Sequence, residues 1–465
     1  MKLKADYIRK TILGLFLATA IGQGHASASG LAAAKESGLQ EINEQGMALD
    51  LSLEQAIDDA KNNNVLLKIA REKIDEARAR RWQSDSDLLP HLSLGASQSR
   101  VFWDNFAAQG IPSFGVIGPF NSFDARLQVT QRIFDLSAIS KFQAANMDVD
   151  IAGLEEQLAQ QQIITAAVVA YLDVLQTQEQ LQAVREDVRL ARHLADLAQH
   201  QLEVGVVTNL DVVRAQTRLA EHKAREQEDI QRADTSLLSL KRVIGLPLDS
   251  ELRLSDSLQF FDEKTFAVSD AINSAIKDRF EMSIANSKVK YAQFQLSQAN
   301  RQRLPKASVY GDWGQSAVEP YKYAHNAAQI SVSMSLPIFE GGQIEGEIRQ
   351  QRSLVNQAKT LSNDMQTQVE EDVRLSLQTL TTTTEQVKAA GEALRLATQE
   401  VSLAQDQYTN GVGNNIAVID AQAELENSRQ SYVTALVDYH MARVNYYSAL
   451  GKTESFRLSE AGLSS

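Results

Sequence analysis

Two stretches of the chain carry nearly the same pattern, LEVGVVTNLDVVRAQ at residues 202–216 and QYTNGVGNNIAVIDAQ at residues 407–422. Identical residues recur at an offset of 206 positions, among them Gly205, Ala215 and Gln216, which return as Gly411, Ala421 and Gln422. A recurrence of this length indicates an internal duplication, which must be recognised before any fold is assigned.

The duplication extends toward the N-terminus. Here identical residues recur at an offset of 215 positions, among them Ala56, Ala70, Ala77 and Pro90, which return as Ala271, Ala285, Ala292 and Pro305. The longer offset places about ten extra residues between Pro90 and Phe134 of the first copy, where a surface loop tolerates them. We therefore predict two tandem repeats, residues 29–260 and 261–451, followed by a short tail, residues 452–465.

The first 28 residues have the pattern of a secretory signal peptide. Four basic residues precede the apolar stretch TILGLFLATAIG, and a small-residue site ends at Ala28, after which we expect cleavage. An N-terminal membrane anchor is the alternative, but an apolar run of about 12 residues is too short to span a bilayer. No later stretch reaches about 18 continuous apolar residues, so no transmembrane helix is predicted.

Composition excludes several classes of function. The chain has no cysteine, which removes disulfides, thiolate metal sites and the acylated cysteine of a lipoprotein. Its formal net charge of −13 becomes −16 once the signal, with four basic residues and one acidic residue, is removed. An acidic exported chain lacks the basic surface of a nucleic-acid-binding protein.

Each copy reads as a helix, a strand pair, a very long helix, a tip and a return helix. In the first copy we predict helices over residues 53–88, 137–202 and 209–245, with the tip at 203–209. In the second copy we predict helices over 268–303, 343–408 and 415–451, with the tip at 409–415. Apolar residues at alternating spacings of 3 and 4 give each long helix a coiled-coil seam: Leu181, Val184, Val188, Ala191, Ala195, Ala198 and Leu202, then Val387, Ala390, Leu394, Ala397, Val401, Ala404 and Tyr408.

Between the first two helices of each copy the apolar period changes from 3.6 to 2. We predict β-hairpins over residues 90–134 and 305–339, because apolar and polar residues alternate over 122–133 and 328–336. An amphipathic strand of a soluble sheet is the alternative. Four such strands have no second sheet to cover their apolar faces, and they cannot enclose a pore alone. We therefore infer an oligomeric barrel with lipid outside.

Helix lengths are consistent with a closed hairpin. At 1.5 Å per residue, the long helix of about 66 residues reaches roughly 100 Å, and the first and return helices reach roughly 55 Å each. Two short helices placed end to end match one long helix. Both tips then lie at one end of the rod, and the strand pairs lie at the other.

With these features, residues 50–451 resemble the TolC-type outer-membrane efflux channel family, including the strand–turn PIFEGG at residues 337–342. The resemblance implies a mainly α-helical fold with β-strands that span the membrane. Three chains would form a periplasmic α-barrel and a twelve-stranded outer-membrane β-barrel in a Gram-negative bacterium. It implies a homotrimeric exit duct in contact with outer-membrane lipid, with neither enzymatic activity nor cofactor. Its partners would be a periplasmic adaptor protein and an inner-membrane pump of the RND, ABC or MFS type.

The resemblance also implies a gate at the tips. Tyr408 matches the family's gate tyrosine, Asp211 the carboxylate that bonds it, and Asp420 an acid lining the constriction. Gly413 stands where the family has an arginine, so only a Tyr408–Asp211 hydrogen bond could replace that charged lock. Each residue also has a structural reading: Tyr408 as a seam residue, Asp211 as a helix-start carboxylate and Asp420 as part of a solvated face. The tip residues expected to dock the adaptor are Gly205, Val206, Thr208, Gly411, Val412 and Asn414.

Other candidate sites are weaker. His193 and His200 share a helix face but lie about 10 Å apart, too far to bind one metal ion without a ligand between them. The apolar insertion at residues 102–120 is expected to face the cell exterior, so a label near Gln109 should be accessible on intact cells. A rival hypothesis is a secreted coiled-coil structural protein or adhesin without conduction.

Overall fold

The computed structural model describes residues 49–458 except 103, 106–115, 118, 206, 264, 321, 410, 411, 413 and 414. Several predictions concern residues outside this set: the signal peptide 1–28, the insertion with Trp103 and Gln109, the tip residues Val206, Gly411, Gly413 and Asn414, and the end of the tail. The chain divides into two compact units, of which the larger comprises residues 51–248 and 254–465. The short strands β1 (Leu49–Leu51) and β6 (Leu252–Leu254) pair with each other; the elements below belong to the larger unit.

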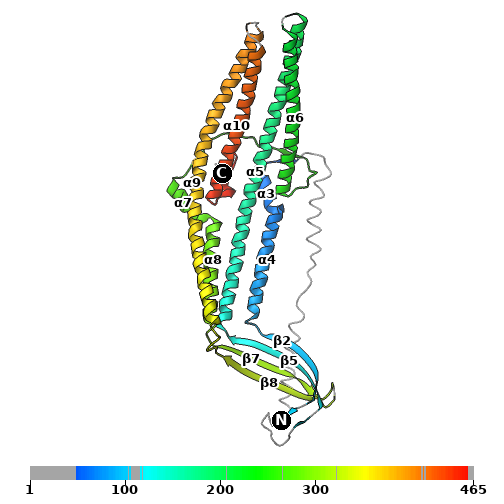
Figure 1. The fold of residues 1–465 in the computed structure, drawn as a ribbon, viewed down its shortest axis with the longest axis vertical. Helices are drawn as coiled ribbons and strands as arrows, with labels where there is room; N and C mark the ends of the chain where they lie inside the picture. Colours follow the sequence, from blue (N-terminus) through cyan, green and yellow to red (C-terminus); the bar gives the residue numbers. More distant parts are fainter. Residues whose placement is uncertain are drawn as a thin grey trace. The chain divides into compact units, whose positions relative to one another are not determined.

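The larger unit contains two helical hairpins and one sheet (Figure 1). In the first copy, α5 (Leu136–Glu203) is followed by the return helix α6 (Asn209–Ile244). In the second copy, α9 (Gln343–Thr409) is followed by α10 (Asn415–Ala449). These helices, with the amphipathic strands described below, confirm the predicted fold class of long helical hairpins combined with four principal strands per chain.

The helix before each sheet strand is broken, which corrects the continuous helices predicted over 53–88 and 268–303. The first copy has α3 (Leu53–Asn63) and α4 (Val65–Ser86), separated by Asn64 in an extended conformation. The Asn64 side chain accepts from the Leu66 amide and donates to the Val243 carbonyl at 2.7 Å. This side chain therefore caps the N-terminus of α4 and anchors the α3–α4 break to α6. The second copy has α7 (Val268–Asp278) and α8 (Phe280–Arg301), with the same extended backbone at Arg279.

Each return helix ends against the break of its own repeat. α6 ends at Gly245 with φ 76°, and a Cβ built there would lie 2.7 Å from the Cβ of Asn63. Gly451, two residues after α10, has φ 72°, and a Cβ there would lie 3.1 Å from the Asp278 carbonyl. A left-handed conformation with this little space requires glycine. The two short helices therefore meet end to end beside one long helix in both copies.

The predicted seams form the contacts within the hairpins. α5 packs against α6 toward the tip and against α4 and α8 toward the sheet, and α9 packs against α10 and α8 (Figure 1). The seam residues that are fully buried are Val184, Val188, Ala191, Ala195, Ala198, Val387, Ala397 and Val401. By length and composition α5 could also cross a membrane. Its central apolar residues, among them Ile164, Val168 and Leu172, are instead buried in helix packing.

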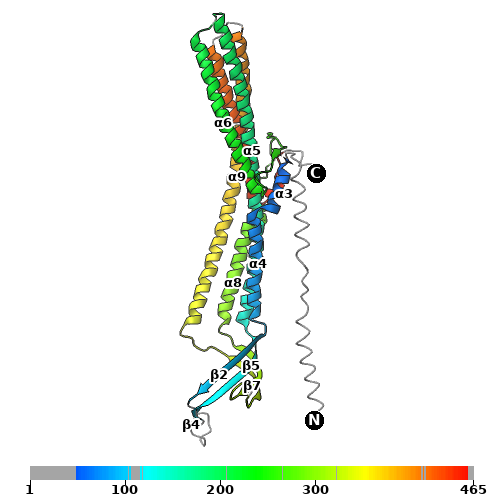
Figure 2. The same ribbon diagram turned by 90° about the vertical axis from the view of Figure 1, so that its right-hand side faces the viewer.

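The four-stranded sheet has the order β2–β5–β7–β8, all antiparallel, and lies at the end of the helices opposite the tips (Figures 1 and 2). The strands are β2 (His91–Val101), β5 (Phe120–Phe134), β7 (Lys306–Ala317) and β8 (His325–Ser335). Within the described residues, the outer edges of β2 and β8 pair with no other long strand. A sheet with two open edges is a template for pairing with further chains.

The register separates the two faces of the sheet as the alternation predicted. Leu92, Val129, Gly311 and Ile330 lie side by side across the four strands. On this face the exposed apolar residues are Leu92, Leu94, Val129, Trp313, Ile330, Val332 and Met334. On the other face Arg126 bonds Asp124 at 2.7 Å and Asp312 at 2.8 Å. One face is therefore suited to hydrocarbon and the other to water.

Candidate functional site

The first tip joins α5 to α6 through a tight turn at Gly205. Gly205 has φ 78° and its amide donates to the Leu202 carbonyl, so α5 ends there. Thr208 is the N-cap of α6, and Asp211 completes the cap by accepting from both the Thr208 amide at 3.0 Å and the Thr208 hydroxyl at 2.7 Å. These two donors lower the pKa of Asp211. The helix-start reading of Asp211 is thus the one that the contacts support.

Tyr408 does not bond Asp211, so that hydrogen-bond prediction is wrong within one chain. Its hydroxyl instead donates to Oε1 of Gln201, on α5. Burial and then the nearby charge of Asp211 raise the pKa of Tyr408. Within one chain Asp211 therefore acts on Tyr408 electrostatically, and its Oδ2 accepts the two hydrogen bonds from Thr208. The Tyr408–Gln201 bond links the second hairpin to the first, which is the connection a gate of this kind needs.

Both tips expose apolar side chains. Val204 is 74% exposed and Leu210 is 56% exposed in the first tip, and Val412 is 84% exposed in the second. The Val412 amide donates to the Gln407 carbonyl, which closes the end of α9. Exposed apolar residues of this kind are typical of surfaces that contact other proteins. Sequence reasoning listed Val412 but missed Val204 and Leu210, although apolar residues flanking a polar turn were a readable signal.

Asp420 lies on α10 and is exposed in the single chain. Its place in a ring depends on copies of the chain that the structure does not contain, so the constriction role stays a prediction.

A polar seam that the sequence did not reveal joins the two hairpins behind the tips. Arg225 of α6 pairs with Glu426 of α10, and Arg429 of α10 pairs with Asp187 of α5 at 3.3 Å. Each pair crosses from one repeat to the other. Coulomb attraction between these half-buried groups therefore stabilises the hairpins in contact. Partners more than 200 positions apart leave no local pattern in the sequence.

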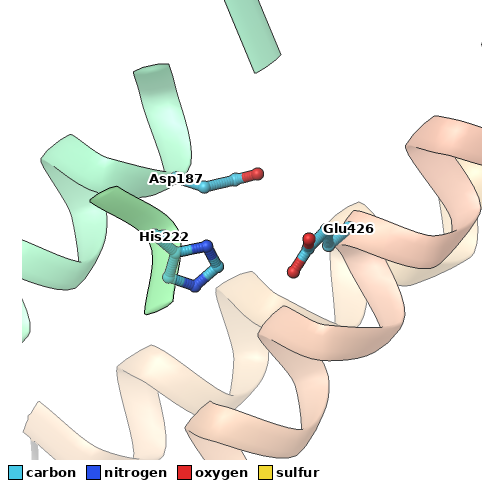
Figure 3. Close-up of side chains that lie close together, drawn as sticks. All are labelled: Asp187, His222 and Glu426. Atoms are coloured by element: carbon cyan, nitrogen blue, oxygen red, sulfur yellow. The ribbon is translucent and has the colours of Figure 1, made fainter. Parts of the chain in front are cut away.

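Within the described part of the chain, one group of side chains has metal-ligand geometry. Asp187, His222 and Glu426 come from α5, α6 and α10 and point toward one another (Figure 3). Neither His193 nor His200, the histidines considered from the sequence, belongs to the group.

The chain is similar to known proteins along most of its length. Residues 56–246 and 271–452 match the family described as outer membrane efflux protein. Outer membrane protein TolC of Escherichia coli is 27% identical over 401 residues, covering 82% of this chain and 77% of that protein. Alkaline protease secretion protein AprF of Pseudomonas aeruginosa is 22% identical over 410 residues, covering 87% and 85%.

Solved structures share the fold. The CmeC outer membrane channel of Campylobacter jejuni matches with a TM-score of 0.75 at 20% identity, covering 88% of this chain and 87% of that one. The open state of the MtrE outer membrane channel of Neisseria gonorrhoeae matches with a TM-score of 0.74 at 19% identity, covering 86% and 89%. Both likenesses concern the whole arrangement of hairpins and sheet.

Proposed function

The chain belongs to the outer membrane efflux protein family, and from this premise we propose that three copies of it assemble into one exit duct. The protein is a channel component of the Gram-negative outer membrane with a periplasmic tunnel, and it is not an enzyme. In the proposed trimer, the sheets close into a twelve-stranded barrel and the helical hairpins close into the tunnel.

One observation carries the assembly of several copies into one barrel: within the described residues, the four-stranded sheet has open edges at β2 and β8 and an exposed apolar face. The number three is what the family resemblance implies. Four strands cannot close on themselves, because the smallest barrels need about eight. Pairing β8 of one copy with β2 of the next satisfies both edges at once. Lipid then covers residues such as Leu94 and Ile330, while Arg126 and its two carboxylate partners face the water-filled interior.

The tips supply the proposed contact with a periplasmic adaptor, through which the duct serves an inner-membrane pump of the RND, ABC or MFS type. Support comes from the exposed apolar residues Val204, Leu210 and Val412, since unpartnered apolar surface at a helical tip favours docking. Similar proteins include the probable efflux pump outer membrane protein SepC of Pseudomonas putida and the alkaline protease secretion protein AprF. The cargo class we propose is accordingly a small molecule or a protein delivered by that pump.

We assign the gate to Tyr408, held by Gln201 rather than by Asp211, with Asp420 lining the constriction. The polar seam of Arg225–Glu426 and Arg429–Asp187 holds the hairpins together on the side of the gate toward the sheet. Opening then requires the second hairpin to move away from the first and break these contacts.

Cross-linking tests the trimer directly, because the chain has no cysteine of its own. Ser93→Cys on β2 and Ser331→Cys on β8, introduced together, should give a ladder that ends at three chains when a flexible bis-maleimide is added in detergent. Each single variant should give no trimer band, since neighbouring copies then carry no β2–β8 pair of thiols. A monodisperse monomer with full β signal would end the proposal. A fibre-forming adhesin would instead fractionate without detergent.

A further inference from the structure

Three potential ligands converge between the hairpins. Asp187, His222 and Glu426 each offer one ligand atom, and these atoms all lie within 4.8 Å of one another. Figure 3 shows the two carboxylates and the imidazole ring facing one space from three different helices. Ligands held by three packed helices have fixed directions, unlike carboxylates gathered on one exposed helix face.

The space between these side chains is a real cavity. It has a volume of about 30 Å³, and its lining includes all three ligand residues and Gln422. That volume accommodates a single water molecule or ion. Gln422 Nε2 is buried there without a hydrogen-bond partner. Rotation of the Gln422 amide by 180° would turn its oxygen into the cavity as a fourth donor.

Two arginines orient the carboxylates without using all of their oxygens. Arg429 Nη1 donates to Oδ1 of Asp187, which leaves Oδ2 for an ion. Arg225 pairs with Oε1 of Glu426, which leaves Oε2 for an ion. Carboxylates that ligate metals are themselves commonly held by outer hydrogen bonds. The arginines therefore serve as positioning groups, and a third arginine, Arg218, also lines the cavity.

We propose that Asp187, His222 and Glu426 bind one divalent transition-metal ion, of which Zn²⁺ is the representative. An imidazole with two carboxylates suits zinc, copper or nickel, whereas calcium and magnesium take oxygen ligands alone. Zinc completes a tetrahedron with Gln422 or water.

The ion would cross-link the two hairpins. Asp187 and His222 belong to the first repeat and Glu426 to the second, so a bound ion cross-links the elements that must separate on opening. Binding itself does not depend on the proposed function, whereas this restraint on opening rests on it. Zinc should consequently narrow the channel rather than merely occupy its surface.

Zinc titration of the detergent-purified full-length protein, followed by calorimetry, tests the binding. The wild type should bind one Zn²⁺ per chain more than His222→Gln. His193→Gln, which alters an exposed histidine on α5, should bind as the wild type does, and Ca²⁺ should give no heat at this site. Asp187→Asn, which preserves side-chain volume, should lose the same equivalent and provides the comparison should His222→Gln fail to fold. Zinc uptake that is equal in wild type, His222→Gln and Asp187→Asn would overturn the site.

Bilayer recordings test separately whether this cross-link restrains opening. Zinc should lower the conductance of Asp420→Asn channels, in which an acidic ring can no longer cause block, and should leave the Asp420→Asn/His222→Gln double variant unchanged. Zinc binding with unaltered conductance would retain the site and overturn its effect on opening. If neither the wild type nor Asp420→Asn conducts in bilayers, although calorimetry shows zinc binding, the result would count against the proposed function instead.

Discussion

The hydroxyl of Tyr408 on α9 donates a hydrogen bond to Gln201 on α5, one helical turn before the first tip. The bond crosses from the second repeat to the first at the level where a tunnel built from these hairpins would be narrowest. A neutral bond of this kind contributes about 0.5–1.5 kcal/mol net. In the proposed gate, the closed tip would therefore depend on the packing of the Tyr408 ring as well as on its hydroxyl.

The first prediction separates these two contributions. Tyr408→Ala should raise single-channel conductance markedly, and Tyr408→Phe should raise it less, because only the hydroxyl is lost. Gln201→Leu should match Tyr408→Phe, and combining the two should add little, as expected for residues that share one interaction. Asp211→Ala should do less than Tyr408→Ala, since its carboxylate caps α6. Planar-bilayer recordings in which Tyr408→Ala conducts as the wild type does would place the gate elsewhere.

The second prediction concerns Asp420. If three copies form an anionic ring, Asp420→Asn should weaken cation preference and block by multivalent cations, without changing trimer stability. Reversal potentials in asymmetric salt measure the preference directly. Asp196→Asn, an exposed acid on α5, is the matched control and should leave selectivity unaltered. Equal selectivity in both variants would restrict Asp420 to a solvated helix face.

The third prediction concerns the junction of α6 with the α3–α4 break. Gly245→Ala should destabilise the protein by at least about 1–2 kcal/mol, the cost of a left-handed conformation, and the approach of Asn63 should add to it. Gly153→Ala is the control, because Gly153 lies within α5 with open space at its Cβ. That change should stabilise by about 0.5–1 kcal/mol. Melting temperatures in detergent measure both effects. A shift of the same sign in both variants would contradict the claim that the junction requires glycine at position 245.

The sequence predicted the hairpins well for a physical reason. A seam such as Val184, Val188 and Ala191 follows from helical periodicity, which is a local property of the sequence. The duplication also shows the pattern of each element twice. The strand faces were predictable for the same reason, because alternation alone decides which residues share a face.

Contacts between elements were not predictable in that way. The break at Asn64 depends on the Val243 carbonyl, a tertiary partner 179 positions away. The partner of Tyr408 depends on which α5 residue lies at its height, and Gln201 is 207 positions away. Ion pairs such as Arg429–Asp187 have the same character. Only the packed helices bring these residues together.

The fourth prediction follows from a buried histidine. His440 on α10 lies beside Arg443 and bonds the Gln259 carbonyl, and burial followed by the Arg443 charge lowers the pKa of His440 to about 3. Between pH ~6.5 and ~3 the unfolded chain binds this proton and the folded chain does not, so stability falls as pH falls through that range. His440→Gln should flatten the difference in melting temperature between pH 7.5 and pH 5. His193→Gln, an exposed change, should leave the slope as it is in the wild type.

The fifth prediction uses two neighbouring residues of β8 that point to opposite faces. Ile330 is 81% exposed on the apolar face, and Ser331 lies on the polar face opposite Tyr310. If lipid covers the apolar face, Ile330→Arg should destabilise the barrel by about 2–4 kcal/mol near the bilayer midplane. Ser331→Arg adds the same charge and bulk to the water-filled interior, so the trimer should persist while conductance falls and anion passage rises. Heat-resistant trimer on gels and bilayer conductance measure the two effects.

Because the variants differ by a single position in one strand, general disruption of β8 would impair both alike. Normal assembly of Ile330→Arg together with failure of Ser331→Arg would mean that the sheet faces lipid with its other side.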